Sequence, residues 1–263
     1  MRTVDGTIIE KHRFPSPCSQ IDLYVVTYIS QGLKVKGYLA EPKGEGLFPG
    51  LLYLRGGIKN VGMTRISRVI QFASEGFVVM APFYRGNRGG EGTEDFAGED
   101  RYDAVHACHL LQHHPRVDKQ SIHVYGFSRG GLMALWTAIL VRELSSVVVW
   151  GGVSDLVLTY EERVDLRKMM KRVIGGTPEK EKAGYVARTP LDSVDRIHAP
   201  ILIVHGKQDE HVSVEHAKLL EAALKKADKP FEMWLFDEYT HHFPPIIQRK
   251  VTRKITEWMK SWS

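Results

Sequence analysis

The sequence has few cysteines and no grouped metal ligands. Cys18 and Cys108 are its only two cysteines, which excludes a disulfide scaffold and leaves no Cys-x-x-Cys pair for zinc. His106, His109 and His113 fall on one face of a predicted helix beside Cys108. No second ligand group accompanies them, and one helix cannot easily close a four-coordinate site. We therefore expect no metal and no organic cofactor.

Long apolar runs are also missing. No stretch approaches the ~18 consecutive apolar residues that a membrane span requires. The first residues, Met1 to Gly6, lack the apolar core of a secretory signal peptide. The sequence thus predicts a soluble, cytoplasmic protein without a membrane partner.

Charge of one sign is only slightly in excess. Thirty-six Lys and Arg residues against 31 Asp and Glu residues give a net charge of +5, and no basic arm is present. This mild excess argues against a nucleic-acid partner. Hydrophobic residues make up 43% of the chain and charged residues 25%, which is typical of a globular protein with a sizeable core.

Short apolar runs alternate with helical patterns from about residue 48 onward. The runs predict strands at 50–55, 76–82, 121–127, 147–150, 201–205 and 231–236. The helical patterns cover 64–75, 101–113, 130–142, 214–226 and 246–262. This alternation predicts an α/β fold, with a doubly wound, mainly parallel sheet and helices on both faces.

The two parts of the chain outside this alternation are the N-terminal region and one insertion. Residues 21–30 and 33–42 are rich in β-formers around Gln31-Gly32, which predicts an antiparallel hairpin at the sheet edge. Residues from about 156 to 200 are charged and helical, and we expect them to form a small cap. No linker or internal repeat interrupts the chain, so residues 1–263 are predicted to form a single domain.

The sharpest chemical signal is a Gly-x-Ser-x-Gly motif around Ser128. It stands between a predicted strand and a predicted helix, in the run Gly126-Phe-Ser-Arg-Gly-Gly131. Such a turn exposes the serine hydroxyl above the sheet, and the helix N-terminus favours a developing oxyanion. In an unrelated context the serine would only cap the helix. Here the context predicts a nucleophile.

A serine nucleophile needs a histidine base and a carboxylate that orients it. Asp209 follows the strand that ends at His205, at the same predicted sheet edge as Ser128. Glu210 and Asp155 are alternatives for this carboxylate. The base is expected after the last strand, where His241 and His242 are adjacent in the sequence and both stay open at this point.

Together these motifs resemble the catalytic domain of prolyl-oligopeptidase-type serine peptidases, and also dienelactone-hydrolase-like esterases. The resemblance runs from about residue 34 to the end and includes Gly206-x-x-Asp-x-x-Val212 and the turn Tyr84-Arg-Gly-Asn-Arg-Gly-Gly90. It implies an α/β-hydrolase fold. Because the family histidine is followed by one small residue and then phenylalanine, the resemblance selects His241, two residues before Phe243.

The resemblance also implies an oxyanion hole and a substrate pocket. The backbone N–H groups of Arg129 and of Gly57, in the loop after the first parallel strand, are the implied donors. Arg55 is expected either to donate from its side chain or to form an ion pair at the sheet edge. We expect the pocket to include Arg55, Tyr84 and Tyr160; Tyr160 is the one aromatic left where proline-selective members have several.

We therefore expect a serine hydrolase that cleaves peptide or amide bonds of short peptides, with a carboxylesterase on small acyl esters as the alternative. The sequence lacks the repeats of the β-propeller that usually accompanies these peptidases, which weakens any limit on substrate size. It leaves the oligomeric state open, a homo-oligomer included. A catalytically silent, ligand-binding hydrolase fold is a further hypothesis. The basic cap segment suggests an attraction for carboxylates, through Arg163, Arg167, Lys168, Lys171 and Arg172.

Overall fold

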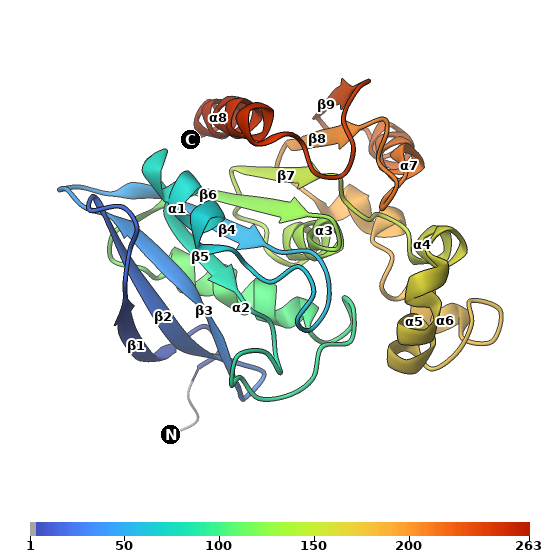
Figure 1. Ribbon diagram of the computed structural model, residues 1–263, viewed down its shortest axis with the longest axis horizontal. Coiled ribbons are helices and arrows are strands. Elements are labelled where there is room, and N and C mark those ends of the chain that lie inside the picture. Colours follow the sequence, from blue (N-terminus) through green and yellow to red (C-terminus); the bar gives the residue numbers. More distant parts are fainter. Residues whose placement is uncertain (1–3) are drawn as a thin grey trace.

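The computed structural model describes residues 4–263, which form one nine-stranded sheet in the order β1-β2-β3-β5-β4-β6-β7-β8-β9 (Figure 1). The six strands β5, β4, β6, β7, β8 and β9 run parallel to one another. The pairs β1–β2, β2–β3 and β3–β5 are antiparallel. The strand bounds are Ile8–Phe14 (β1), Ile21–Ser30 (β2), Leu33–Pro42 (β3), Phe48–Leu54 (β4), Val78–Pro82 (β5), Val117–Phe127 (β6), Ser146–Trp150 (β7), Ile201–Gly206 (β8) and Phe231–Phe236 (β9).

Helices cover both faces of this sheet, so each face has its own hydrophobic core. Helices α1 (Ile66–Ser74) and α8 (Pro245–Lys260) pack on one face, through Phe72 and Ile255 among others. Helices α2 (Arg101–Gln112), α3 (Gly130–Leu140) and α7 (Val214–Lys226) pack on the other. Apolar side chains occupy both sides of the central strands because both faces are covered. The predicted α/β class and doubly wound sheet are confirmed.

The N-terminal strands extend the sheet at one edge. The hairpin of β2 and β3 pairs Ile21 with Pro42 and Ser30 with Leu33, with Gln31 and Gly32 at positive φ in the turn. These are the bounds that the sequence predicts. Strand β1 adds a further antiparallel edge strand. The sequence analysis missed β1 because most of its side chains are exposed and leave no apolar pattern.

The segment between β7 and β8 contains three short helices that project beyond the carboxyl ends of the strands (Figure 1). They are α4 (Leu156–Glu162), α5 (Arg167–Ile174) and α6 (Lys182–Val186), with 3₁₀ turns at Val164–Leu166 and Leu191–Arg196. We call the segment from α4 to α6 the cap segment. Tyr160 and Tyr185 join α4 to α6 edge to face, with their ring centroids 5.9 Å apart.

The parallel strands bring three of the predicted functional residues to one edge of the sheet. Ser128 follows β6, Asp209 lies just beyond β8, and His241 lies beyond β9. Carboxyl ends of parallel strands form the usual site edge of an open α/β sheet. Among residues 4–263, no helix is both long and apolar enough to cross a membrane.

Candidate active site

Ser128 lies in a sharp turn between β6 and α3, with a backbone φ of 58°. This left-handed conformation is uncommon for a residue with a side chain and needs close packing to hold it. A Cβ atom on Gly126 would lie 2.1 Å from the Gly130 carbonyl oxygen, and one on Gly130 would lie 2.2 Å from that of Leu54. The flanking glycines therefore let strand, helix and neighbouring strand approach closely around the serine.

Asp209 and His241 form a buried hydrogen-bonded pair. The Asp209 Oδ2 and His241 Nδ1 atoms are 2.7 Å apart, and the other carboxylate oxygen accepts the backbone N–H groups of His211 and Val212. Burial alone would raise the pKa of Asp209. The hydrogen bonds from His241 and from the two backbone N–H groups outweigh burial and hold this pKa below its ordinary value.

The end of β7 connects this pair to the serine turn. The Ser128 N–H donates to the Trp150 carbonyl oxygen at 3.1 Å. At the next residue, Gly151, a Cβ atom would lie 3.3 Å from both Asp209 Oδ2 and His241 Nδ1. The Phe127 ring, next to Ser128, lies 4.7 Å from the His241 ring between centroids. Serine, carboxylate and imidazole therefore share one small region of the sheet edge.

Two backbone N–H groups beside Ser128 have no acceptor within residues 4–263. They belong to Arg129, at the start of α3, and to Gly57, in the loop after β4. Gly56 packs directly on the serine: a Cβ atom there would lie 2.7 Å from Ser128 Cβ and 3.2 Å from its Oγ. Free N–H donors beside a hydroxyl are what an oxyanion hole requires.

Close to these donors is a buried group of four charged side chains, which we call the inner ion cluster. Its members are Arg55, Glu94, Asp100 and Arg129. Glu94 Oε1 accepts Arg55 Nη2 at 2.9 Å and Arg129 Nη1 at 2.7 Å, while Arg129 also bonds Asp100. Each of these side chains is at most 1% exposed. Each charge thus has an opposite partner, as buried charges require.

The inner ion cluster also holds the loop after β4. Arg129 Nη1 donates to the Gly57 carbonyl oxygen at 2.8 Å, and Glu94 Oε2 accepts the Lys59 N–H at 2.6 Å. Burial raises the pKa of Glu94, but the charges of Arg129 and Arg55 outweigh it and leave this pKa below its ordinary value. One carboxylate therefore joins the serine turn to the loop that carries Gly57.

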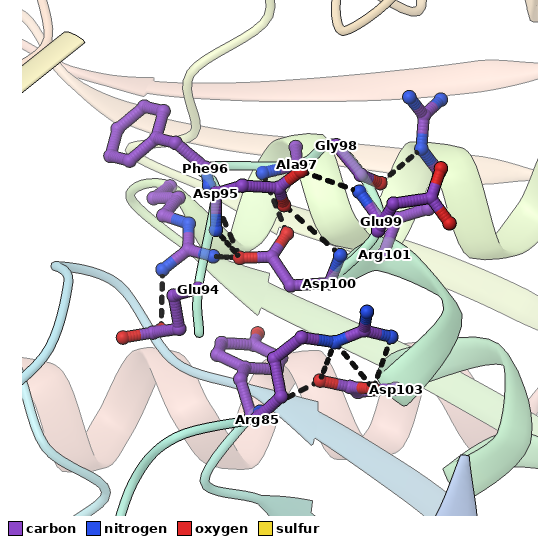
Figure 2. Close-up of polar contacts among 12 residues, drawn as sticks. Arg85, Glu94, Asp95, Phe96, Ala97, Gly98, Glu99, Asp100, Arg101 and Asp103 are labelled. Atoms are coloured by element: carbon purple, nitrogen blue, oxygen red, sulfur yellow. Dashed lines mark hydrogen bonds and ion pairs between the residues drawn. The ribbon is translucent and has the colours of Figure 1, made fainter. Parts of the chain in front are cut away.

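The segment before α2 supplies the acidic side of this cluster. The Asp100 carboxylate accepts the backbone N–H groups of Asp95, Phe96 and Ala97, at 2.8–3.1 Å. Figure 2 shows these N–H groups converging on Asp100 from a tight turn. In the same view Arg85 forms a forked pair with Asp103, 2.8 Å at its shortest. The turn is thereby fixed from within by charge-assisted hydrogen bonds.

Two predicted pocket residues are corrected by this geometry. Arg55 and Tyr84 are only 1% and 0% exposed, so neither side chain lines a surface that a substrate can reach. The Arg55 guanidinium bonds Glu94 and the carbonyl oxygens of Phe83, Gly56 and Val61, and it stacks on the Tyr84 ring. Of the two roles expected for Arg55, the structure has the ion pair. Tyr160 is half-buried in the cap segment, and its part in a pocket stays a prediction.

The alternative acids and the alternative base lack the Asp209–His241 arrangement. Asp155 caps α4 by accepting the Leu158 N–H, Glu210 is exposed, and His242 is exposed beside His241. His205, which the sequence analysis did not single out, lies with Nε2 2.8 Å from the Val212 carbonyl oxygen and 3.5 Å from Asp209 Oδ2. Burial lowers the pKa of His205, which favours a neutral ring that braces the Asp209 loop. No sequence motif distinguishes it from an ordinary strand residue.

Residues 64–263 match the model of the prolyl oligopeptidase family. The chain belongs to this family. It is 59% identical over 97% of its length to the uncharacterized peptidase YtmA of Bacillus subtilis (strain 168), 99% of which the match covers. It is 27% identical to peptidase YuxL of the same organism, over 88% of this chain but only 37% of YuxL. The resemblance stated from the motifs is confirmed, and the chain is a serine hydrolase.

Solved structures agree with the fold. An acylaminoacyl peptidase in complex with Z-Gly-Gly-Phe-chloromethyl ketone superposes with a TM-score of 0.78 at 20% identity, over 92% of this chain and 42% of that one. The acetyl xylan esterase from Paenibacillus sp. R4 gives a TM-score of 0.74 at 20% identity, over 94% of this chain and 87% of the esterase. Both show the α/β-hydrolase architecture. Within residues 4–263, no three His, Cys, Asp or Glu side chains converge as a metal site would require.

Proposed function

We propose that this chain hydrolyses peptide bonds of short peptides through an acyl-enzyme formed on Ser128, with His241 as base and Asp209 as the carboxylate that orients it. The observation that carries the proposal is the convergence of a strained serine turn and a buried Asp209–His241 pair at one sheet edge. The peptide-bond assignment is supported by membership of the prolyl oligopeptidase family and by the peptidase name of a relative 59% identical.

In the proposed reaction, His241 Nε2 takes the Ser128 proton as Oγ attacks the substrate carbonyl carbon. Asp209, bonded to the other ring nitrogen, keeps His241 in the required tautomer and stabilises the imidazolium. The Arg129 and Gly57 N–H groups bind the carbonyl oxygen as it becomes negative. His241 then passes the proton to the leaving amine as the C–N bond breaks. Water releases the acyl group by the same steps, with His241 again as base.

A carboxylesterase acting on small acyl esters is the second candidate. The acetyl xylan esterase favours it, because this chain covers 87% of that protein, against 42% of the acylaminoacyl peptidase. The same serine, base and oxyanion donors serve both reactions, so the residues alone do not choose between them. Only relative rates on matched amide and ester substrates distinguish the two.

The test is a panel of aminoacyl, dipeptidyl and acyl-ester chromogenic substrates, assayed with wild type and Ser128→Ala. We expect Ser128→Ala to lower kcat by about 10⁴-fold or more and to abolish labelling by a fluorophosphonate probe. Full activity of Ser128→Ala would overturn the mechanism. A wild type that cleaves esters but no peptide substrate would favour the esterase, and failure of the probe to label folded wild type would favour a silent binding protein.

The two adjacent histidines provide a matched control. His241→Ala is expected to lower kcat by about 10⁴-fold, because it removes the base, whereas His242→Ala should change kcat by less than about tenfold. Circular dichroism and melting temperature establish that both variants fold. The reverse order of effects would show that His242 is the base.

A further inference from the structure

A hollow of about 420 Å³ lies between the turn after β5 and the second half of the loop that connects β4 to α1. None of its lining residues takes part in the proposed reaction. Its walls include Tyr38, Gly62, Thr64, Arg65 and Arg88. Arg65 and Arg88 are both exposed. Two guanidinium groups in one hollow suggest a negatively charged ligand.

The Arg88 side chain is held in place by aromatic residues, but no carboxylate in the described chain neutralises its charge. Nη1 donates to the Tyr38 hydroxyl at 2.6 Å, and the guanidinium stacks 5.0 Å from the Phe83 ring centroid. Within residues 4–263, no carboxylate oxygen lies within 4.0 Å of the Arg88 or Arg65 nitrogens. The inner ion cluster has the opposite arrangement, with a carboxylate against each guanidinium. A fixed but unpaired guanidinium is ready for a ligand carboxylate.

A buried hydroxyl points to the same kind of ligand. Thr64 is 3% exposed, and its Oγ1 has no hydrogen-bond partner in the described chain. A buried hydroxyl without a partner is costly, so an acceptor from a ligand would satisfy it. Thr64 directly precedes Arg65, the N-cap of α1, whose N-terminus adds a partial positive charge to the hollow.

The hollow adjoins the proposed active site through the loop after β4. A Cβ atom on Gly62, in the hollow wall, would lie 2.9 Å from the Gly56 carbonyl oxygen and 3.1 Å from the Gly57 nitrogen. Gly56 in turn packs on Ser128. The hollow is therefore walled by the same loop that carries one of the proposed oxyanion donors.

The fold places the hollow on the histidine side of the site. Arg65 is the N-cap of α1, and α1 packs against α8, the helix that follows the loop carrying His241: Arg68 Nη1 donates to Thr252 Oγ1 at 3.2 Å. The hollow at the start of α1 therefore lies toward the loop that carries His241. Because the base delivers its proton to the leaving group, ligands on this side belong to the leaving part of a substrate.

We propose that this hollow binds the C-terminal carboxylate of the leaving peptide fragment, through Arg88, Arg65 and the Thr64 hydroxyl. The inference rests on the proposed peptidase function and refines its substrate class. It makes the chain selective for short peptides with a free C-terminus over the same peptides with a C-terminal amide. The carboxylate takes no part in bond breaking and leaves unchanged on the released amine.

The test compares kcat/KM for an acetylated tripeptide acid with kcat/KM for its C-terminal amide. In wild type we expect the acid to be favoured by about tenfold or more, as charge-assisted hydrogen bonds imply. Arg88→Gln and Arg65→Gln should each bring this ratio toward one, with a larger effect on KM than on kcat. Arg142→Gln is the matched control, because Arg142 is exposed just after α3, at the opposite sheet edge from Ser128. An acid-to-amide ratio that both hollow variants leave unchanged would overturn the inference.

Two further measurements separate this inference from the proposed function. If wild type cleaves none of the peptides, the Ser128→Ala protein is titrated with the tripeptide acid and amide by calorimetry. Binding of the acid that Arg88→Gln abolishes in this background supports the hollow on its own, and equal binding of acid and amide overturns it. A preference for succinyl over acetyl esters that depends on Arg88 would also overturn it, since it would place the carboxylate on the acyl side.

Discussion

The inner ion cluster and the cap segment are both rich in charge, but burial gives their charges different roles. In the inner ion cluster the side chains are at most 1% exposed, and Glu94 alone contacts Arg55, Arg129 and the Lys59 N–H. In the cap segment, the Arg163–Asp165 pair has side chains 22% and 62% exposed. Water screens the second pair and is absent from the first. We therefore expect the buried charges beside the loop after β4 to matter for stability, and the exposed charges of the cap segment to be replaceable.

The largest expected difference is in stability. Glu94→Ala leaves two arginines buried without their shared carboxylate, and we expect the free energy of unfolding to fall by about 3–5 kcal/mol. Asp165→Ala removes an exposed partner and should cost less than about 1 kcal/mol. Urea denaturation of both variants measures this contrast. Similar losses in the two variants would show that burial does not set the value of these charges.

A conservative change at the same carboxylate tests whether the inner ion cluster also affects catalysis. Glu94→Gln keeps the shape of the side chain but removes the charge that bonds both Arg129 and the Lys59 N–H of the loop carrying Gly57. If this loop supplies an oxyanion donor, kcat should fall by about tenfold to a hundredfold with little change in KM. The kcat–KM split is read from steady-state kinetics under conditions where the variant stays folded. An effect confined to KM would place Glu94 in substrate binding instead of loop positioning.

The pH dependence of stability is the third contrast. Because the pKa of Glu94 is lowered in the folded chain, its ionised form contributes stability above the unfolded value of about 4.3, and this contribution is lost as pH falls through the folded value. Glu94→Gln should therefore flatten the loss of stability between about pH 5 and pH 3. Unfolding curves across this range test the point, with Asp165→Asn as the control. Parallel pH curves for wild type and Glu94→Gln would argue against it.

The sequence predicts a region well when the contacts that determine its structure are between residues close together in the chain. The hairpin at 21–42 and the serine turn depend on neighbours within a few residues, and motif and periodicity found both. Strand β6 begins at Val117, four residues before its predicted start, because Phe48 and Pro49 of β4 pair there across a register shift. That pairing is set by a distant strand.

The inner ion cluster is the extreme case of non-local information. Glu94 and Arg129 are 35 positions apart and Arg55 lies 39 positions before Glu94, so no local pattern relates them. This is why the sequence left two roles open for Arg55. It also assigned Tyr84 to a pocket, although the Tyr84 ring is buried and contacts the guanidiniums of both Arg55 and Arg129. Motifs identify the residues that do chemistry more readily than those that hold them in place.

The smallest expected effect concerns the exposed charges of the cap segment. Arg167 is partly engaged, because it donates to the Tyr160 and Glu161 carbonyl oxygens, so Lys168 and Lys171 are the better residues for a test of attraction alone. If the cap attracts anionic substrates, Lys168→Glu combined with Lys171→Glu should lower kcat/KM on anionic relative to neutral substrates by about threefold at low salt. The difference should vanish near 1 M salt, where the screening length is about 3 Å. If the fall in kcat/KM on anionic substrates persisted at high salt, Lys168 and Lys171 would contact the substrate directly. The cap segment would then bind substrate through specific contacts, as is proposed for Arg88 in the hollow.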